Sequence, residues 1–135
     1  MRFYRWHDKR YIDDCIMYAK DLTRWMWIDV NKDIPDMGLF ITDASGVLLW
    51  YELLGVAHHN DMVLYEVEPV GELHARHFYQ EHYGKECEFR QWVATEGLYI
   101  VRLIADMDFE GLRPEFTTGD MGYILDVIKK RIERG

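Results

Sequence analysis

The stretch from Gly38 to Leu54, GLFITDASGVLLWYELL, constrains the fold of this 135-residue chain more than any other. Two runs rich in β-forming residues flank the tetrapeptide Asp43-Ala44-Ser45-Gly46. Asp suits the first position of a type I turn, and Gly suits the left-handed position that follows it. The pattern therefore predicts a β-hairpin with strands over 39–43 and 47–54 and a positive φ at Gly46.

The spacing of apolar residues predicts the remaining elements. Steps of three and four residues favour helices, whereas strict alternation favours strands. Thr118 is suited to cap the last helix. The expected helices are 11–28, 71–83, 85–94 and 119–134. The expected strands outside the hairpin are 62–68, 98–105 and, as an additional fifth strand, 2–6.

These elements predict an α+β fold that forms a single domain over residues 1–135. A mainly antiparallel sheet of four or five strands carries helices packed on it, in the order α-β-β-β-α-α-β-α. A chain of this length fits one domain. Its hydrophobic fraction of 49% supplies a core without disulfides or structural metals.

Charge is distributed unevenly along the chain, whose net charge is −8. The segments 1–28 and 127–135 carry net charges of +2 and +3, and the segment 29–126 between them carries −13. An acidic middle repels nucleic-acid phosphates and anionic membranes and attracts a basic protein partner. The alternative is that the acidity serves solubility alone.

The sequence also favours a cytoplasmic location. No apolar run approaches the roughly 18 residues of a membrane span. The first residues lack the apolar core and cleavage site of a signal peptide. Cys15 and Cys87 are typical of small buried thiols in a reducing compartment.

Three residues, His74, His77 and Glu81, are candidates for a metal site. On a helix over 71–83 they would share one face, and imidazole and carboxylate groups at such steps can bind zinc. Their spacing matches no standard zinc motif, so a solvated polar face is the alternative. The chain contains no phosphate-binding loop, CxxC pair or nucleophile elbow, and we expect no cofactor.

A second acidic group, Asp106, Asp108 and Glu110, follows the expected strand over 98–105. In an extended chain these carboxylates point the same way and could hold Mg²⁺, or they form an acidic surface loop. Arg102 lies among apolar residues of that strand. It could pair with Glu66 or Glu68 on a neighbouring strand, extend to water at the rim, or bind a ligand anion.

The composition and charge favour a non-enzymatic protein-binding module, of the inhibitor or immunity type, that occupies a basic partner surface. The alternatives are a small-ligand sensor with a pocket between sheet and helices, and a metal-dependent hydrolase. A symmetric homodimer would bury the wide apolar face of the 11–28 helix. The residues expected to bind the partner are Trp50, Tyr65, Glu66, Glu68, Asp106, Asp108 and Glu110.

Overall fold

The computed structural model describes residues 1–7, 15–19, 38–53, 62–82, 85–107, 109–112 and 118–134. Within these ranges the chain forms seven strands and two helices. The strands are β1 (Phe3–His7), β2 (Ile16–Tyr18), β3 (Leu39–Thr42), β4 (Val63–Val70), β5 (Leu73–His82), β6 (Lys85–Ala94) and β7 (Gly97–Asp106). The helices are α1 (Ala44–Leu53) and α2 (Thr118–Arg134).

The expected four- or five-stranded sheet is wrong. The described strands form one seven-stranded antiparallel sheet in the order β2-β7-β4-β1-β3-β6-β5. The ranges 71–83 and 85–94, predicted as helices, contain strands β5 and β6, and β2 lies inside the predicted helix 11–28. The predicted element order is therefore wrong as well, although β1, β3, β4, β7 and α2 lie where the sequence patterns placed them.

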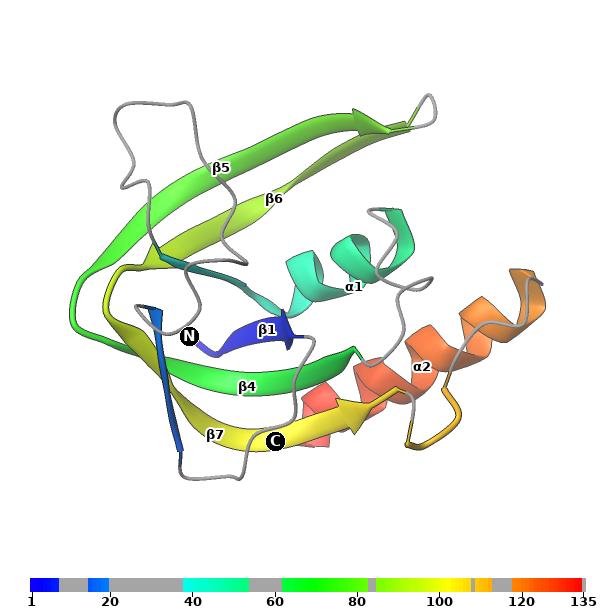
Figure 1. The fold of residues 1–135 in the computed structure, drawn as a ribbon. Coiled ribbons are helices and arrows are strands. Elements are labelled where there is room, and N and C mark those ends of the chain that lie inside the picture. The colour runs from blue at the N-terminus through cyan, green and yellow to red at the C-terminus, as the bar shows by residue number, and fades with distance from the viewer. Residues whose placement is uncertain are drawn as a thin grey trace.

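A long, bent β-ribbon forms the frame of the sheet. β4 continues into β5 through Gly71 and Glu72, and β6 continues into β7 through Thr95 and Glu96. β4 pairs with β7 and β5 pairs with β6, so the bend divides one hairpin into two halves (Figure 1). β1 and β3 lie between the halves, because β1 pairs with β4, β3 pairs with β6, and β1 pairs with β3.

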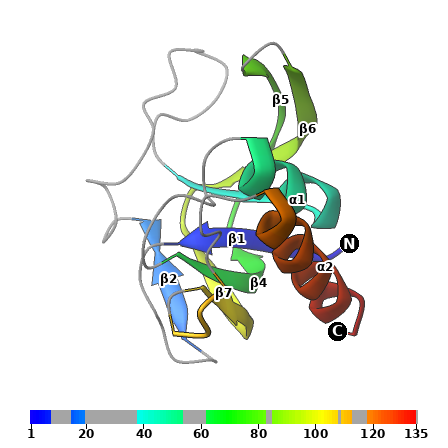
Figure 2. The same cartoon turned by 90° about the vertical axis from the view of Figure 1, so that its right-hand side faces the viewer.

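Each face of the sheet carries an apolar core. Both helices lie on one face (Figure 2), where α1 and α2 bury side chains against β1, β4 and β7. Alternation along β1 sends Tyr4 and Trp6 to this helix-covered face and Phe3 to the opposite face. The core of the opposite face consists of Met17, Ala19, Leu39, Ile41, Val63, Tyr65, Val67, Ala94, Leu98 and Ile100.

The first strand of the predicted hairpin is present as β3, but helix α1 replaces its turn and its second strand, 47–54. The Asp43 Oδ1 atom accepts a hydrogen bond from the Gly46 N–H at 2.9 Å, and the Asp43 carbonyl accepts one from the Val47 N–H at 3.0 Å. Asp43 is therefore the N-cap of α1. A type I turn and a first helical turn have similar backbone angles, so this tetrapeptide suits both. Among the described glycines, Gly71 and Gly111 have positive φ and Gly46 does not, which makes that prediction wrong too.

We expect Asp43→Ala to lower the free energy of unfolding by about 1 kcal/mol, because the substitution removes the side-chain acceptor at the N-cap. Asp43→Asn is the matched control, since it keeps a capping oxygen and loses only the charge. Urea denaturation followed by circular dichroism measures both. Equal stability of Asp43→Ala and the wild-type chain would contradict the assignment of the cap.

Tyr51 of α1 lies in the core beneath the helices. Its ring stacks on Trp6 with centroids 5.4 Å apart, and the Trp6 Nε1–H donates to the Val47 carbonyl at 3.2 Å. Tyr51 is only 1% exposed, and its hydroxyl has no hydrogen-bond partner among the described residues. Burial raises the pKa of Tyr51 to about 12 from an ordinary value of 10.0.

Tyr51→Phe should leave the stability at pH 7 unchanged or raise it by up to about 1 kcal/mol, because it removes a buried polar group without a partner. Because burial favours the neutral phenol in the folded state, the protonated Tyr51 contributes to the free energy of unfolding of the wild-type chain. That contribution is fully present below pH 10 and is lost as the pH rises towards about 12. The variant should therefore lose less stability than the wild-type chain over that range. Denaturation curves from pH 7 to pH 12 test this, and equal alkaline losses would contradict it.

Candidate functional site

The structure does not gather the expected partner-binding residues on one exposed surface. Tyr65 is completely buried in the core opposite the helices, and Trp50 is half-buried on α1. Asp106 is buried at the end of β7, and Asp108 lies outside the described residues. Glu68 is exposed near the end of β4. Glu66 and Glu110 each form an ion pair within the chain.

The pairing of Arg102 with Glu66 is confirmed. The Arg102 Nε–H donates to the Glu66 Oε1 atom at 3.1 Å, and the Glu66 side chain is 12% exposed. Both Nη atoms of Arg102 also lie 3.4 Å from the carbonyl oxygen of Arg131 on α2. Arg102 therefore joins β4 and β7 to the last turn of α2, where a cation favourably meets helix carbonyls.

Glu110 and Arg131 make a second, two-pronged ion pair at the same helix. The Arg131 Nη1 and Nη2 atoms lie 2.9 and 2.7 Å from the two Glu110 carboxylate oxygens. The hydrogen bond to Glu110 is the main reason that the pKa of Arg131 is raised. Arg131 also donates to the Ile104 carbonyl at 3.0 Å, and Glu110 accepts the Asp106 N–H at 2.9 Å. These contacts hold α2 and the loop after β7 against the sheet.

Glu110→Gln should lower the free energy of unfolding by about 1 kcal/mol, because it weakens a two-pronged, partly buried ion pair. Asp126→Asn is the matched control. Asp126 pairs with Lys130 at 2.9 Å within α2, and both side chains are exposed, so its loss should cost under about 0.5 kcal/mol. Urea denaturation compares the two variants. Equal effects would show that Glu110 does not anchor α2.

The candidate metal site at His74, His77 and Glu81, the alternative to a solvated polar face, depended on a helix over 71–83. Because β5 is a strand, positions 74, 77 and 81 do not share a helical face. The His74 Nε2 atom lies 3.4 Å from the Glu72 Oε2 atom, whereas the side chains of His77 and Glu81 lie outside the described part. Among the described residues, no three or more His, Cys, Asp or Glu side chains are grouped to hold a metal ion.

The sheet carries an exposed aromatic surface that the sequence patterns did not reveal. We call it the bend surface, and it consists of Ile16, Tyr18, Glu68, Glu72, Glu96 and Tyr99. The register pairs Tyr99 with Ile16 on one side and with Glu68 on the other. Ile16 and Tyr18 are 36% and 43% exposed, and Tyr99 is half-buried. Apolar and aromatic groups thus reach water beside carboxylates.

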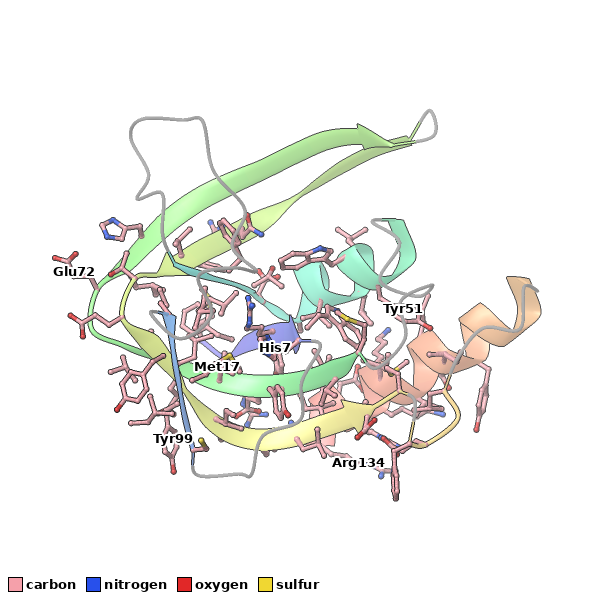
Figure 3. All side chains as sticks on the ribbon, in the orientation of Figure 1. His7, Met17, Tyr51, Glu72, Tyr99 and Arg134 are labelled. Atoms are coloured by element: carbon pink, nitrogen blue, oxygen red, sulfur yellow. The ribbon has the colours of Figure 1, made fainter. Side chains whose placement is uncertain are left out.

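Alternation along β2 and β7 explains why these side chains are exposed. Met17 and Leu98 point into the core opposite the helices, so Ile16, Tyr18 and Tyr99 point to the other face. Helix α2 covers that face near Arg102 but not at its far end, where Tyr99 lies (Figure 3). Gly97 brings β2 close, since a Cβ there would lie 2.6 Å from the Met17 carbonyl oxygen.

Three carboxylates border the aromatic part of the bend surface. Glu68 and Glu96 are exposed, and the Glu72 side chain is 78% exposed. The Glu96 carboxylate lies directly against Gly71, whose φ of 78° forms the turn from β4 into β5. Glu72 and Tyr99 lie along the outer side of the bend, apart from Arg134 at the basic end of α2 (Figure 3).

Comparison with known proteins gives no relative from which a function can be transferred. The chain matches no protein-family model, no curated protein and no solved structure. In the part that the structure describes, neither helix is both long enough and apolar enough to cross a membrane.

Proposed function

We propose that this chain is a non-enzymatic protein-binding module and that a basic surface of its partner docks on the bend surface. The observation that carries the proposal is the exposure of Ile16 and Tyr18 beside Tyr99, with three carboxylates around them. Tyrosine combines apolar area with a polar tip and is enriched at the centres of protein interfaces. The carboxylates supply complementarity to lysine and arginine side chains.

This proposal keeps the expected class of partner but changes the anchoring residues. Truncating Tyr65 would remove a completely buried core side chain, so a loss of binding in that variant would report unfolding. Tyr18 and Tyr99 take the anchoring role that was expected of Trp50 and Tyr65. Glu68 remains from the expected set, joined by Glu72 and Glu96. An inhibitor or immunity-type role in the cytoplasm fits such a module.

The net charge of −8 adds long-range attraction to this contact. Opposite charges speed the diffusional encounter of two proteins, and salt shortens the range of that attraction. The Glu66 and Glu110 carboxylates lie close to Arg102 and Arg131, so their charges are largely compensated within the fold. Glu68 and Glu96, for which the described part of the chain shows no ion pair, and Glu72, whose neighbour is a histidine, are therefore better placed to attract a partner.

The test starts with affinity capture from the source organism on the immobilised chain, with mass spectrometry to identify the retained proteins. We expect a partner that the wild-type chain retains and a Tyr18→Ser/Tyr99→Ser variant does not. Binding of the purified partner should weaken at least about tenfold in that variant, as for interface anchors. Glu68→Gln/Glu72→Gln should mainly slow association, and so should raising salt from about 50 to about 500 mM.

A Lys129→Ala/Arg134→Ala variant is the matched control, because it removes two exposed charges from α2, away from the bend surface. It should bind normally, and all variants should retain the wild-type denaturation midpoint. A partner that binds equally well over the whole salt range and is lost only in the control variant would overturn the proposal.

A further inference from the structure

Strand β5 forms an unusually long and regular edge of the described sheet. It has ten residues, and in the described part of the sheet it pairs with β6 alone, whereas β2 at the other edge has three residues. β5 contains no Pro, Lys or Gly. Its register with β6 is unbroken from Leu73 to His82, whereas the β4–β7 register shifts twice. Proteins usually protect long edges with such residues or with bulges.

At two positions, the register of the β5–β6 hairpin sets residues of like charge type opposite each other. Position 81, a glutamate, is the register partner of Glu86, and position 77, a histidine, is the register partner of Arg90. Opposite charges on directly paired positions stabilise a sheet, and like charges weaken it. β5 itself carries one Arg and one Glu, so this edge does not share the strong negative charge of the chain.

We propose that β5 pairs antiparallel with β5 of a second copy of this chain, around a twofold axis at Tyr79. In this register, position 77 of each copy is directly opposite position 81 of the other, so two His–Glu pairs flank the axis. An imidazole N–H donates to a carboxylate, and a protonated imidazole also attracts it. The pairing joins two sheets edge to edge and places position 81 opposite a histidine of the second copy, whereas its register partner within the hairpin is Glu86.

This interface is independent of the bend surface and differs from the dimer expected through the 11–28 helix. A second copy fits β5 better than an unrelated extended segment does, because the twofold axis at Tyr79 sets His77 and Glu81 opposite each other twice, although it also sets Arg76 opposite His82. If an unrelated extended segment of another protein pairs with β5 instead, the purified chain alone stays monomeric. Sedimentation velocity on the full chain, from about 1 to about 100 µM, separates these outcomes.

Three variants test the register while favouring the fold of each copy. Tyr79→Lys places the two lysines of the dimer opposite each other at the twofold axis. Within its own hairpin, the register partner of each lysine is Glu88, which has the opposite charge. Glu81→Lys places a lysine directly opposite His77 of the second copy. Within its own hairpin, the register partner of this lysine is Glu86, which has the opposite charge. The double variant His77→Glu/Glu81→Lys restores opposite charges between the copies, and its position 77 pairs with Arg90.

We expect the wild-type chain to form a concentration-dependent dimer. Tyr79→Lys should weaken it at least about tenfold, Glu81→Lys should weaken it, and the double variant should regain it. Circular dichroism should show the same fold throughout, and Tyr18→Ser/Tyr99→Ser should still dimerise. A wild-type chain that stays monomeric overturns the proposal. So does a dimer that is insensitive to Tyr79→Lys, or one that the double variant does not restore.

Discussion

Backbone pairing of β1 with β3 and β4 holds the two halves of a bent ribbon in one sheet. Without β1 and β3, the β5–β6 half would be an isolated two-stranded ribbon, which is marginally stable in water. Strand β1 contributes side chains to both cores, with Tyr4 and Trp6 beneath the helices and Phe3 on the opposite face.

The acidic residues of the chain have two different roles. Glu66 and Glu110 pair with Arg102 and Arg131, and these contacts fix the last turn of α2 against the sheet. Such partly buried pairs are costly to break because the remaining charge loses its partner. In the described part of the chain, the carboxylates of the bend surface do not fix one element against another in this way. Glu72 lies near His74, two residues further along the chain. Net charge alone therefore does not show which carboxylates are neutralised by ion pairs within the fold.

Sequence patterns predicted the elements whose periodicity is strong and failed where propensity and context disagree. The alternation of β4 and β7, the stripe of α2 and the pairing of Arg102 with Glu66 were all accessible. The range 73–92 contains no Val, Ile or Thr, which weakens its local preference for a strand. It forms β5 and β6 through their pairing with each other and the pairing of β6 with β3. Val47, Trp50 and Tyr51 have the opposite bias, yet they lie in a helix that Asp43 caps and that buries Val47 and Tyr51 in the core. The exposure of Tyr18 depends on β2 being a strand, which its helix-like apolar spacing concealed.

The central position of β1 also affects how the chain acquires its structure during synthesis. β1 is made first, but its partners β3 and β4 begin at Leu39 and Val63, and β2 must wait for β7, which ends at Asp106. The sheet therefore cannot close while the ribosome is still making its second half. Such non-local pairing slows folding and leaves strand-forming segments exposed in the meantime. The nascent chain thus passes through a period of vulnerability to aggregation that a sheet of sequential hairpins would avoid.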